Sequence, residues 1–396
     1  MRILYLCADP GVPVLGRKGC STHVREICRA LTRAGHQALI LCASRGEDVQ
    51  NASDLSIVEV PTPQSLHLGF DVRLMAHNVR FARAARKIFE GFRPDVIYER
   101  FSMYSFTGHR LVRRYRAPRI LEVNAFLSTE QRDRLRFPRL ARWSDRFIVG
   151  KAEHVVVVSE PLRDLVASLG VPQAHIYKMP MSADVHHFTP SISGEKVRTQ
   201  HGLKDRYVIG YVGALTGWHG INLLYDVARL LESKLEDFVF FLVGGDEKKI
   251  AMHTKKAKRL GLESRFVFAG SVPYLEVPEY VRAMDVTIIP DTTYWSSPTK
   301  LFEYQAAGVP TVAPRYAAIV DAMEEGKEGL FFDARNAEQF ADRLVQLALN
   351  PRLRDLMGVN ARRRVVESHS IDRQVATLIE IMERLRGKTP SNGRRQ

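Results

Sequence analysis

Short apolar runs alternate with amphipathic stretches along nearly the whole chain, and this pattern limits the fold more than any other feature. Strands that alternate with helices form parallel sheets covered by helices on both faces. The first series of predicted strands is Arg2–Cys7, Gln37–Ala43, Ser56–Val60, Asp95–Glu99, Arg119–Asn124 and His154–Ser159. The helices predicted between them are Thr22–Ala34, Val72–Phe89, Tyr104–Arg114 and Pro161–Ser168. The pattern predicts the α/β class.

A second series of the same kind follows. Its predicted strands are Tyr207–Gly213, Phe238–Val243, Arg265–Ala269, Val286–Pro290 and Thr311–Ala313. A chain of 396 residues is too long for one ordinary core and fits two domains. We predict an N-terminal domain at 1–182, a C-terminal domain at 183–370, a helix at 371–387 that crosses back to the first domain, and a disordered tail at 388–396.

Composition favours a cytoplasmic protein. No apolar run reaches the ~18–20 residues of a membrane span. The N-terminal residues resemble a first strand more than a signal peptide. All four cysteines fall in the first 42 residues, and none forms a Cys-x-x-Cys pair. Free thiols in a reducing compartment are expected rather than disulfides or zinc.

The segment from Trp295 to Pro310 carries the strongest functional signal. It predicts a helix capped by Ser297, with Pro298 in the first helical position. A helix N-terminus presents free N–H groups and can hold a phosphate. Lys300 adds a positive charge at the same end, and Glu303, one turn further, can accept hydrogen bonds from paired ribose hydroxyls. These features together indicate a nucleotide-sugar site.

The same segment resembles the donor-binding helix of glycosyltransferase family 4, whose members have the GT-B fold. That family has Glu-x7-Glu before Ala-x-Gly-x-Pro; Glu303 matches the second Glu, and Trp295 stands at the first. The chain reads Ser-Pro-Thr-Lys-Leu-Phe-Glu, as in one branch of the family. The resemblance extends from about residue 1 to 385. It implies two Rossmann-like parallel-sheet domains that face each other across a cleft, and a retaining, metal-independent transfer without a cofactor.

Donor-side residues follow from the resemblance. After the first strand, Gly16 and Gly19 precede a helix, where the backbone can approach a ligand. The first loop of the second domain has Gly213, with Ala214 in place of the family's Arg and His219 in place of its Lys; a protonated His219 would pair with phosphate, and a neutral one would donate a hydrogen bond. The remaining donor candidates are Val272 at the base and Ser296, Ser297 and Thr299 beside Lys300 and Glu303.

The acceptor side is expected in the first domain. Asn124 stands where the family often has His and can hold a sugar hydroxyl through its amide. We count it with Lys300, Glu303 and His219 as catalytic. The carboxylates of Glu122 and Glu130 would orient or deprotonate the acceptor, although a strand-end Glu in a buried ion pair is the alternative. Further acceptor-side candidates are Lys18, Glu99 and Arg100.

Charge is distributed unevenly. Residues 1–185 hold 28 Lys and Arg against 18 Asp and Glu, out of 58 and 44 in the chain. A basic stretch with interleaved aromatics runs from Arg132 to Phe147. It fits anionic lipid headgroups, and a solvated helix is the alternative. No nucleic-acid-binding module is visible.

The sequence thus predicts a retaining glycosyltransferase that moves a sugar from a nucleotide sugar to an acceptor in cell-envelope polysaccharide or glycolipid synthesis, in the cytoplasm or at the inner membrane face. Two alternatives stay open. One is glycosylation of a small soluble metabolite. The other is a non-catalytic nucleotide-sugar-binding subunit, because Ala214, Asn124 and Trp295 replace three groups common in the family. The sugar, base, acceptor, linkage and oligomeric state do not follow from the sequence.

Overall fold

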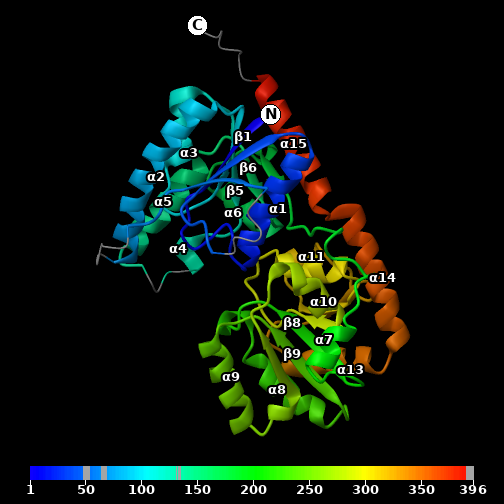
Figure 1. Cartoon of the computed structure of the whole chain (residues 1–396). Coiled ribbons are helices and arrows are strands. Elements are labelled where there is room, and N and C mark those ends of the chain that lie inside the picture. The colour runs from blue at the N-terminus through cyan, green and yellow to red at the C-terminus, as the bar shows by residue number, and fades with distance from the viewer. Residues whose placement is uncertain (48–53, 64–68, 131, 133–134, 389–396) are drawn as a thin grey trace. The chain divides into compact units, whose positions relative to one another are not determined.

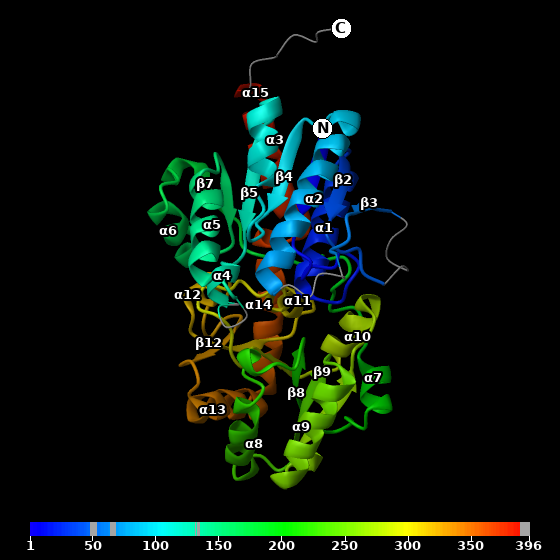
Figure 2. The same ribbon diagram turned by 90° about the vertical axis from the view of Figure 1, so that its left-hand side faces the viewer.

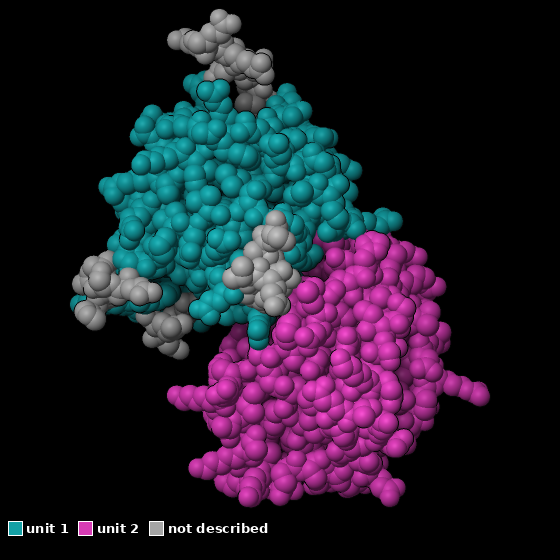
Figure 3. Space-filling view, viewed as in Figure 1, with its two compact units in different colours: residues 1–180, 372–396 teal, residues 181–371 magenta. Residues whose placement is uncertain are grey.

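The structure is a computed structural model that describes residues 1–47, 54–63, 69–130, 132 and 135–388. The chain forms two compact units (Figure 3). Unit 1 is Met1–Pro180 with Asp372–Gln396, and unit 2 is Met181–Ile371. The predicted tail at 388–396 lies, apart from the backbone of Lys388, outside the described residues.

Unit 1 is built on a seven-stranded parallel sheet of order β3-β2-β1-β4-β5-β6-β7. The strands are β1 (Arg2–Cys7), β2 (Gln37–Cys42), β3 (Ser56–Glu59), β4 (Val96–Arg100), β5 (Arg119–Val123), β6 (Val155–Val157) and β7 (Ile176–Lys178). The helices are α1 (Gly19–Arg33), α2 (Phe70–Phe92), α3 (Thr107–Tyr115), α4 (Leu127–Glu130), α5 (Pro138–Gly150), α6 (Glu160–Ser168) and α15 (Ile371–Lys388). Helices α2, α3 and α5 cover one side of the sheet, and α1 and α15 lie on the other (Figure 1).

Unit 2 has a six-stranded parallel sheet of order β10-β9-β8-β11-β12-β13. Its strands are β8 (Tyr207–Val212), β9 (Phe238–Val243), β10 (Phe266–Gly270), β11 (Val286–Ile288), β12 (Thr311–Pro314) and β13 (Gly329–Phe332). Its helices are α7 (Glu195–Gln200), α8 (Leu223–Glu232), α9 (Glu247–Arg259), α10 (Val277–Arg282), α11 (Thr299–Ala306), α12 (Ala317–Val320), α13 (Ala337–Ala348) and α14 (Pro351–Ser368).

Strand order determines where each sheet can bind a ligand. In unit 1 the chain leaves β1 toward β2 and later returns to β4 on its other side; in unit 2 it does the same around β8, with β9 and β11. Parallel sheets bind ligands at such switch points, beyond the carboxyl ends of the strands. The loops after β1 and β4, and after β8 and β11, are therefore the places to look for function.

All eleven predicted strands are present, and the parallel α/β prediction is confirmed. Two strands were missed, because β7 has only three residues with a lysine and β13 is a four-residue run that begins with Gly329. The helix predicted from Tyr104 starts at Thr107 instead. Tyr104 has a left-handed backbone (φ 61°) and donates its N–H to Ser144 Oγ at 3.0 Å, so it cannot start a helix.

A buried ion pair fixes α3 against the sheet of unit 1. Glu99 on β4 accepts hydrogen bonds from Arg119 Nη1 on β5 at 3.0 Å and from Gly108 N at 3.1 Å. Both charged side chains are almost fully buried. A Cβ at Gly108 would lie 1.9 Å from Glu99 Oε2, so only glycine fits beside this carboxylate.

We expect Gly108→Ala to lower the free energy of unfolding by about 3 kcal/mol or more, because it displaces one partner of a buried ion pair. Gly91→Ala is the matched control, since Gly91 lies in α2 with nothing within 4 Å of its added Cβ. The control should be neutral or stabilise by about 1 kcal/mol through helix propensity. Urea unfolding of the two variants measures the difference, and equal stabilities would contradict this account of Gly108.

Candidate active site

Helix α11 begins at Thr299, in the loop that follows β11. Ser297 does not cap it, contrary to our prediction: its buried Oγ accepts a hydrogen bond from Met181 N at 3.1 Å. Pro298 occupies the N-cap position rather than the first helical one. The first N–H groups of a helix have no intrahelical partner and lie at the positive end of its dipole. The start of α11 can therefore still receive an anion.

Lys300, in the first turn of α11, is held against the last part of β8. Its Nζ donates a hydrogen bond to Tyr211 Oη at 2.9 Å and lies 4.0 Å from the centre of that ring. Its hydrogen-bond partner is thus a neutral phenol rather than a carboxylate. Burial lowers the pKa of Lys300 to about 7, although Glu303 opposes the shift. A cation in such surroundings gains strongly from a bound anion.

The loop after β8 is shaped around this lysine. Gly213 has φ 148°, and a Cβ there would lie 2.6 Å from Lys300 Nζ. Gly220 (φ 74°), at the end of the same loop, meets the backbone of Asp291 closely enough to exclude any side chain. Both glycines are required for close approach, and Gly213 in particular makes room for the ammonium group.

His219 lies beside the lysine in the same loop. Its ring centre is 3.5 Å from that of Trp218 and 6.1 Å from that of Tyr211. Burial, followed by the charge of Lys300, lowers the pKa of His219 to about 2. The imidazole is therefore neutral at physiological pH, and a charged pairing with phosphate, one of our two expectations, is not supported. The neutral ring can still donate one hydrogen bond.

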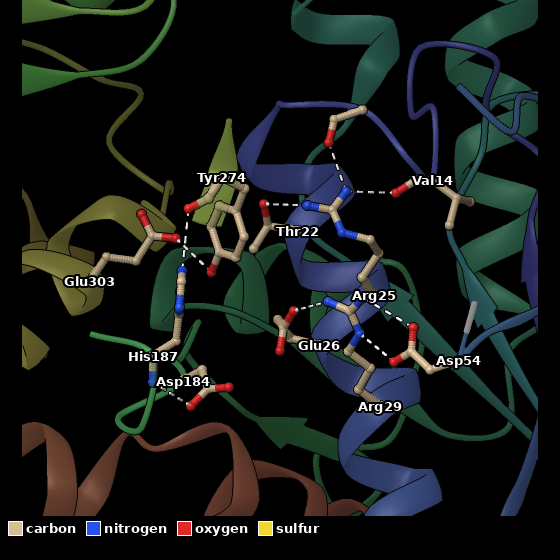
Figure 4. A network of polar contacts seen from close by, with 11 residues as sticks. Val14, Thr22, Arg25, Glu26, Arg29, Asp54, Asp184, His187, Tyr274 and Glu303 are labelled. Carbon is tan, nitrogen blue, oxygen red and sulfur yellow. Dashed lines mark hydrogen bonds and ion pairs between the residues drawn. The ribbon is translucent and has the colours of Figure 1, made fainter. Parts of the chain in front are cut away.

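Glu303 lies one turn along α11 from the lysine and is 8% exposed. It accepts a hydrogen bond from Tyr274 Oη at 3.5 Å (Figure 4). The backbone carbonyl of Tyr274 is 3.2 Å from His187 Nε2, and Asp184 accepts the N–H of His187. Tyr274 and His187 match no motif and were not predicted from the sequence. They place the loop after β10 next to Glu303.

The other donor-side candidates lie around the same edge of the unit 2 sheet. Val272 follows β10 and packs partly against the core. Ser296 precedes α11 and donates its N–H to Thr293 O at 2.9 Å. Thr299 is the first residue of α11. Their roles toward a donor stay predictions.

Asp291, which was not predicted from the sequence either, connects the loops at this edge of the sheet. Its carboxylate accepts hydrogen bonds from Tyr316 Oη at 2.9 Å and from Arg335 Nε at 3.1 Å. Asp291 follows β11, while its partners follow β12 and β13. It therefore links the ends of three strands next to Gly220.

In unit 1, a buried arginine on α1 contacts the loop after β1. Arg25 on α1 is 1% exposed and donates from Nη1 to the carbonyls of Val14 and Gly16 at 2.8 and 2.7 Å (Figure 4). A Cβ at Gly16 would lie 2.6 Å from Pro13 Cγ, so packing alone requires glycine there. Gly19 is the first residue of α1 rather than preceding the helix, contrary to our prediction. Lys18 Nζ donates to Gly11 O at 3.1 Å.

Glu122 on β5 is the centre of a buried charge network. It contacts His23 Nε2 and accepts a hydrogen bond from Tyr5 Oη at 3.2 Å, and Arg100 Nη1 lies 3.8 Å away. Burial opposes ionisation, but His23 and Arg100 outweigh it and lower the pKa of Glu122 to about 2. So acidic a carboxyl is a weak base, and we withdraw the proposal that it deprotonates the acceptor. His23, which is buried on α1, was not predicted from the sequence.

The remaining acceptor-side candidates differ in their surroundings. The carboxylate of Glu99 accepts hydrogen bonds from Arg119 and Gly108. We therefore withdraw Glu99 as a residue that binds the acceptor. Glu130 is exposed at the end of α4. Asn124 follows β5, and its Oδ1 and Nδ2 are both buried without a hydrogen-bond partner among the described residues. Of these residues, Asn124 is the one whose hydrogen-bonding capacity is unused.

Two family models match the chain in succession. Residues 18–180 match the family described as "Glycosyl transferase 4-like domain", and residues 193–364 match "Glycosyl transferases group 1". Together the two matches span most of both units. The chain therefore belongs to glycosyltransferase family 4 and is a glycosyltransferase.

Relatives and structural neighbours agree with this assignment. The chain is 26% identical to a D-inositol 3-phosphate glycosyltransferase of Corynebacterium jeikeium over 77% of this chain and 75% of the relative. It is 25% identical to a mannosylfructose-phosphate synthase of Agrobacterium fabrum over 62% of this chain and 57% of the relative. The fold is similar to sucrose-phosphate synthase of Thermosynechococcus elongatus (TM-score 0.81, 16% identity, 97% and 99% covered). It also resembles Anabaena HepE, solved with UDP (TM-score 0.77, 18% identity, 97% and 100% covered).

We expect donor binding to depend on pH, because the pKa of Lys300 is lowered to about 7. The diphosphate of a nucleotide sugar keeps constant charge near neutrality, whereas Lys300 loses its charge as the pH rises through about 7. We expect the Kd for a nucleotide sugar to rise above pH 7, by up to about tenfold per pH unit at the steepest point. Calorimetry with UDP-glucose between pH 6 and 9 measures this.

The control for this experiment is Lys300→Gln. We expect it to bind the donor weakly, with a Kd that does not change over the same pH range. A wild-type Kd that is flat from pH 6 to 9 would contradict the assignment of Lys300 to the phosphate.

Proposed function

We propose that this glycosyltransferase transfers a sugar from a nucleotide-sugar donor held by unit 2 to an acceptor held by unit 1, with retention of configuration. One observation carries the proposal: a partly buried ammonium group, hydrogen-bonded to a phenol, lies at the start of a helix whose next turn offers a carboxylate. The ammonium group and the helix start suit a diphosphate. The carboxylate of Glu303 suits the paired hydroxyls of a ribose.

The diphosphate would bind where three sources of positive potential meet. These are the first N–H groups of α11, Lys300 and the neutral donor of His219. The last two are close together because both flank the ring of Tyr211. Burial keeps the pKa of Tyr211 well above its ordinary value, so this phenol stays uncharged beside the phosphate. The hydroxyl of Tyr274 contacts Glu303 and would fix the carboxylate for the ribose.

The chemical step follows from these groups. In a retaining transfer of this type, the leaving phosphate accepts the proton of the acceptor hydroxyl, and attack occurs on the face that the phosphate leaves. No enzyme nucleophile is needed. Charge that develops on the leaving diphosphate is stabilised by donors that are already in position, so little reorganisation is required. Asn124 would hold a sugar hydroxyl with its two amide atoms, which have no partner among the residues that the structure describes.

For the acceptor, we propose a cell-envelope saccharide or glycolipid, handled at the inner membrane face. The excess of positive charge in residues 1–185 supports an acceptor at an anionic surface. Glycosylation of a small soluble phosphorylated compound is the second candidate. Two observations favour it: the named relatives act on inositol phosphate and make mannosylfructose phosphate, and unit 1 keeps Arg100 at its sheet edge.

Removal of either key side chain tests the donor site. We expect Lys300→Ala and Glu303→Ala each to lower turnover at least about tenfold, which corresponds to ~1.4 kcal/mol of barrier. The matched control is Lys256→Ala: Lys256 Nζ also lies over a tyrosine ring, 4.5 Å from the centre of Tyr225, but on α9. It should keep wild-type turnover.

The assay should follow both transfer and donor hydrolysis. A screen of UDP-, GDP- and dTDP-sugars by thermal shift selects the donor, since a ligand at 100 times its Kd stabilises the fold by about 2.7 kcal/mol. Wild-type turnover in both Lys300→Ala and Glu303→Ala would refute the site. A wild-type protein that binds the donor but neither hydrolyses nor transfers it would identify a non-catalytic subunit.

A further inference from the structure

One outer face of unit 1 is strongly basic. Helices α5, α3 and α2 lie next to one another on that face (Figure 2). Exposed Lys and Arg side chains number five on α2, three on α3 and three on α5. Of the acidic residues on these helices, Asp71 and Asp145 are buried, and Glu90 already pairs with Arg86 at 3.1 Å. The positive charge of this face is therefore mostly uncompensated by its own helices.

Helix α5 also exposes large apolar side chains. Phe137, Leu140 and Trp143 are 42%, 41% and 55% exposed and follow one another at three-residue spacing along one side of the helix. Exposed arginines lie between them, at 139 and 142, and Arg146 follows. Exposed apolar side chains clustered in this way mark an interaction surface.

Hydrogen bonds and aromatic contacts hold α5 against its neighbours. The carboxylate of Asp71 on α2 accepts the backbone N–H groups of Arg136 and Phe137, at 3.2 and 2.9 Å, which holds the start of α5. The ring of Trp143 stacks on Phe147, 5.6 Å away between centres. Phe106, just before α3, packs edge-on against Phe147. The apolar side chains thus project from a packed aromatic cluster.

We propose that the face formed by α2, α3 and α5 docks unit 1 on an anionic lipid bilayer. Trp143 and Leu140 enter the interfacial region, where tryptophan is favoured, and the arginines meet the headgroups. Charge complementarity argues for an anionic partner. The exposed leucine and tryptophan argue for a bilayer rather than a nucleic acid, since a phosphate backbone offers nothing apolar for Leu140 to contact.

The proposal deepens the proposed function, because it brings the enzyme to the place where a lipid-linked acceptor lies. It is nevertheless tested without donor or turnover. Failure of vesicle binding would leave the transferase proposal intact, and loss of transfer in the Lys300 variant would leave the docking surface intact.

The test is co-sedimentation of the full chain with vesicles of phosphatidylcholine alone and with vesicles that also contain phosphatidylglycerol. We expect binding to the anionic vesicles only, and weaker binding as salt is raised. The triple variant Arg139→Glu, Arg142→Glu, Arg146→Glu should bind at least tenfold more weakly. The double variant Leu140→Ser, Trp143→Ser keeps every charge, and it should bind the anionic vesicles several-fold more weakly.

The matched control is the triple variant Lys248→Glu, Lys255→Glu, Lys258→Glu on α9 of unit 2, which makes the same change in net charge on exposed positions. It should bind within about twofold of wild type. Circular dichroism and thermal melting check that each variant is folded. Absence of binding by the wild-type protein, an equal loss in the α9 control, or binding to duplex DNA but not to vesicles would each overturn the proposal.

Discussion

The ammonium group of Lys300, partly buried beside a neutral phenol at the start of α11, is the constraint on which our account of the site depends. An ammonium group removed from water is unfavourable unless it is paired, and here burial lowers its pKa to about 7. Gly213 leaves room for it, and Tyr211 accepts its hydrogen bond. A bound diphosphate would supply a charged partner for this ammonium group, and for that reason our proposal gives Lys300 the main role in donor binding.

The two units treat charge in opposite ways. In unit 1 the charges at the sheet edge are paired internally, as in the contacts of Glu122 with His23 and Arg100. Among the described residues, the amide of Asn124 has both polar atoms without a hydrogen-bond partner, and Arg100 Nη1 also has none. In unit 2 the ammonium group of Lys300 has a neutral phenol as its hydrogen-bond partner. This arrangement is what our proposal of an anionic donor in unit 2 rests on.

Most strands could be predicted from the sequence, because buried parallel strands appear as apolar runs. Only β7 and β13 were too short to be recognised. Lys300 and Glu303 could be predicted to lie together because their spacing along one helix is a local property; their roles stay predictions. Ser297 was misread since its hydroxyl bonds to Met181, more than a hundred residues away. Separations of 99 and 29 residues likewise hid the pairing of His23 with Glu122 and the contact of Tyr274 with Glu303. The part of α5 that is exposed rather than buried also follows only from packing.

The most direct test of the central claim is a crystal structure of the protein with the tightest-binding nucleotide sugar. The account predicts that the diphosphate lies at the first turn of α11, with a phosphate oxygen within hydrogen-bonding distance of Lys300 Nζ and the ribose hydroxyls on Glu303. A diphosphate bound elsewhere, with Lys300 still bonded only to Tyr211, would contradict it.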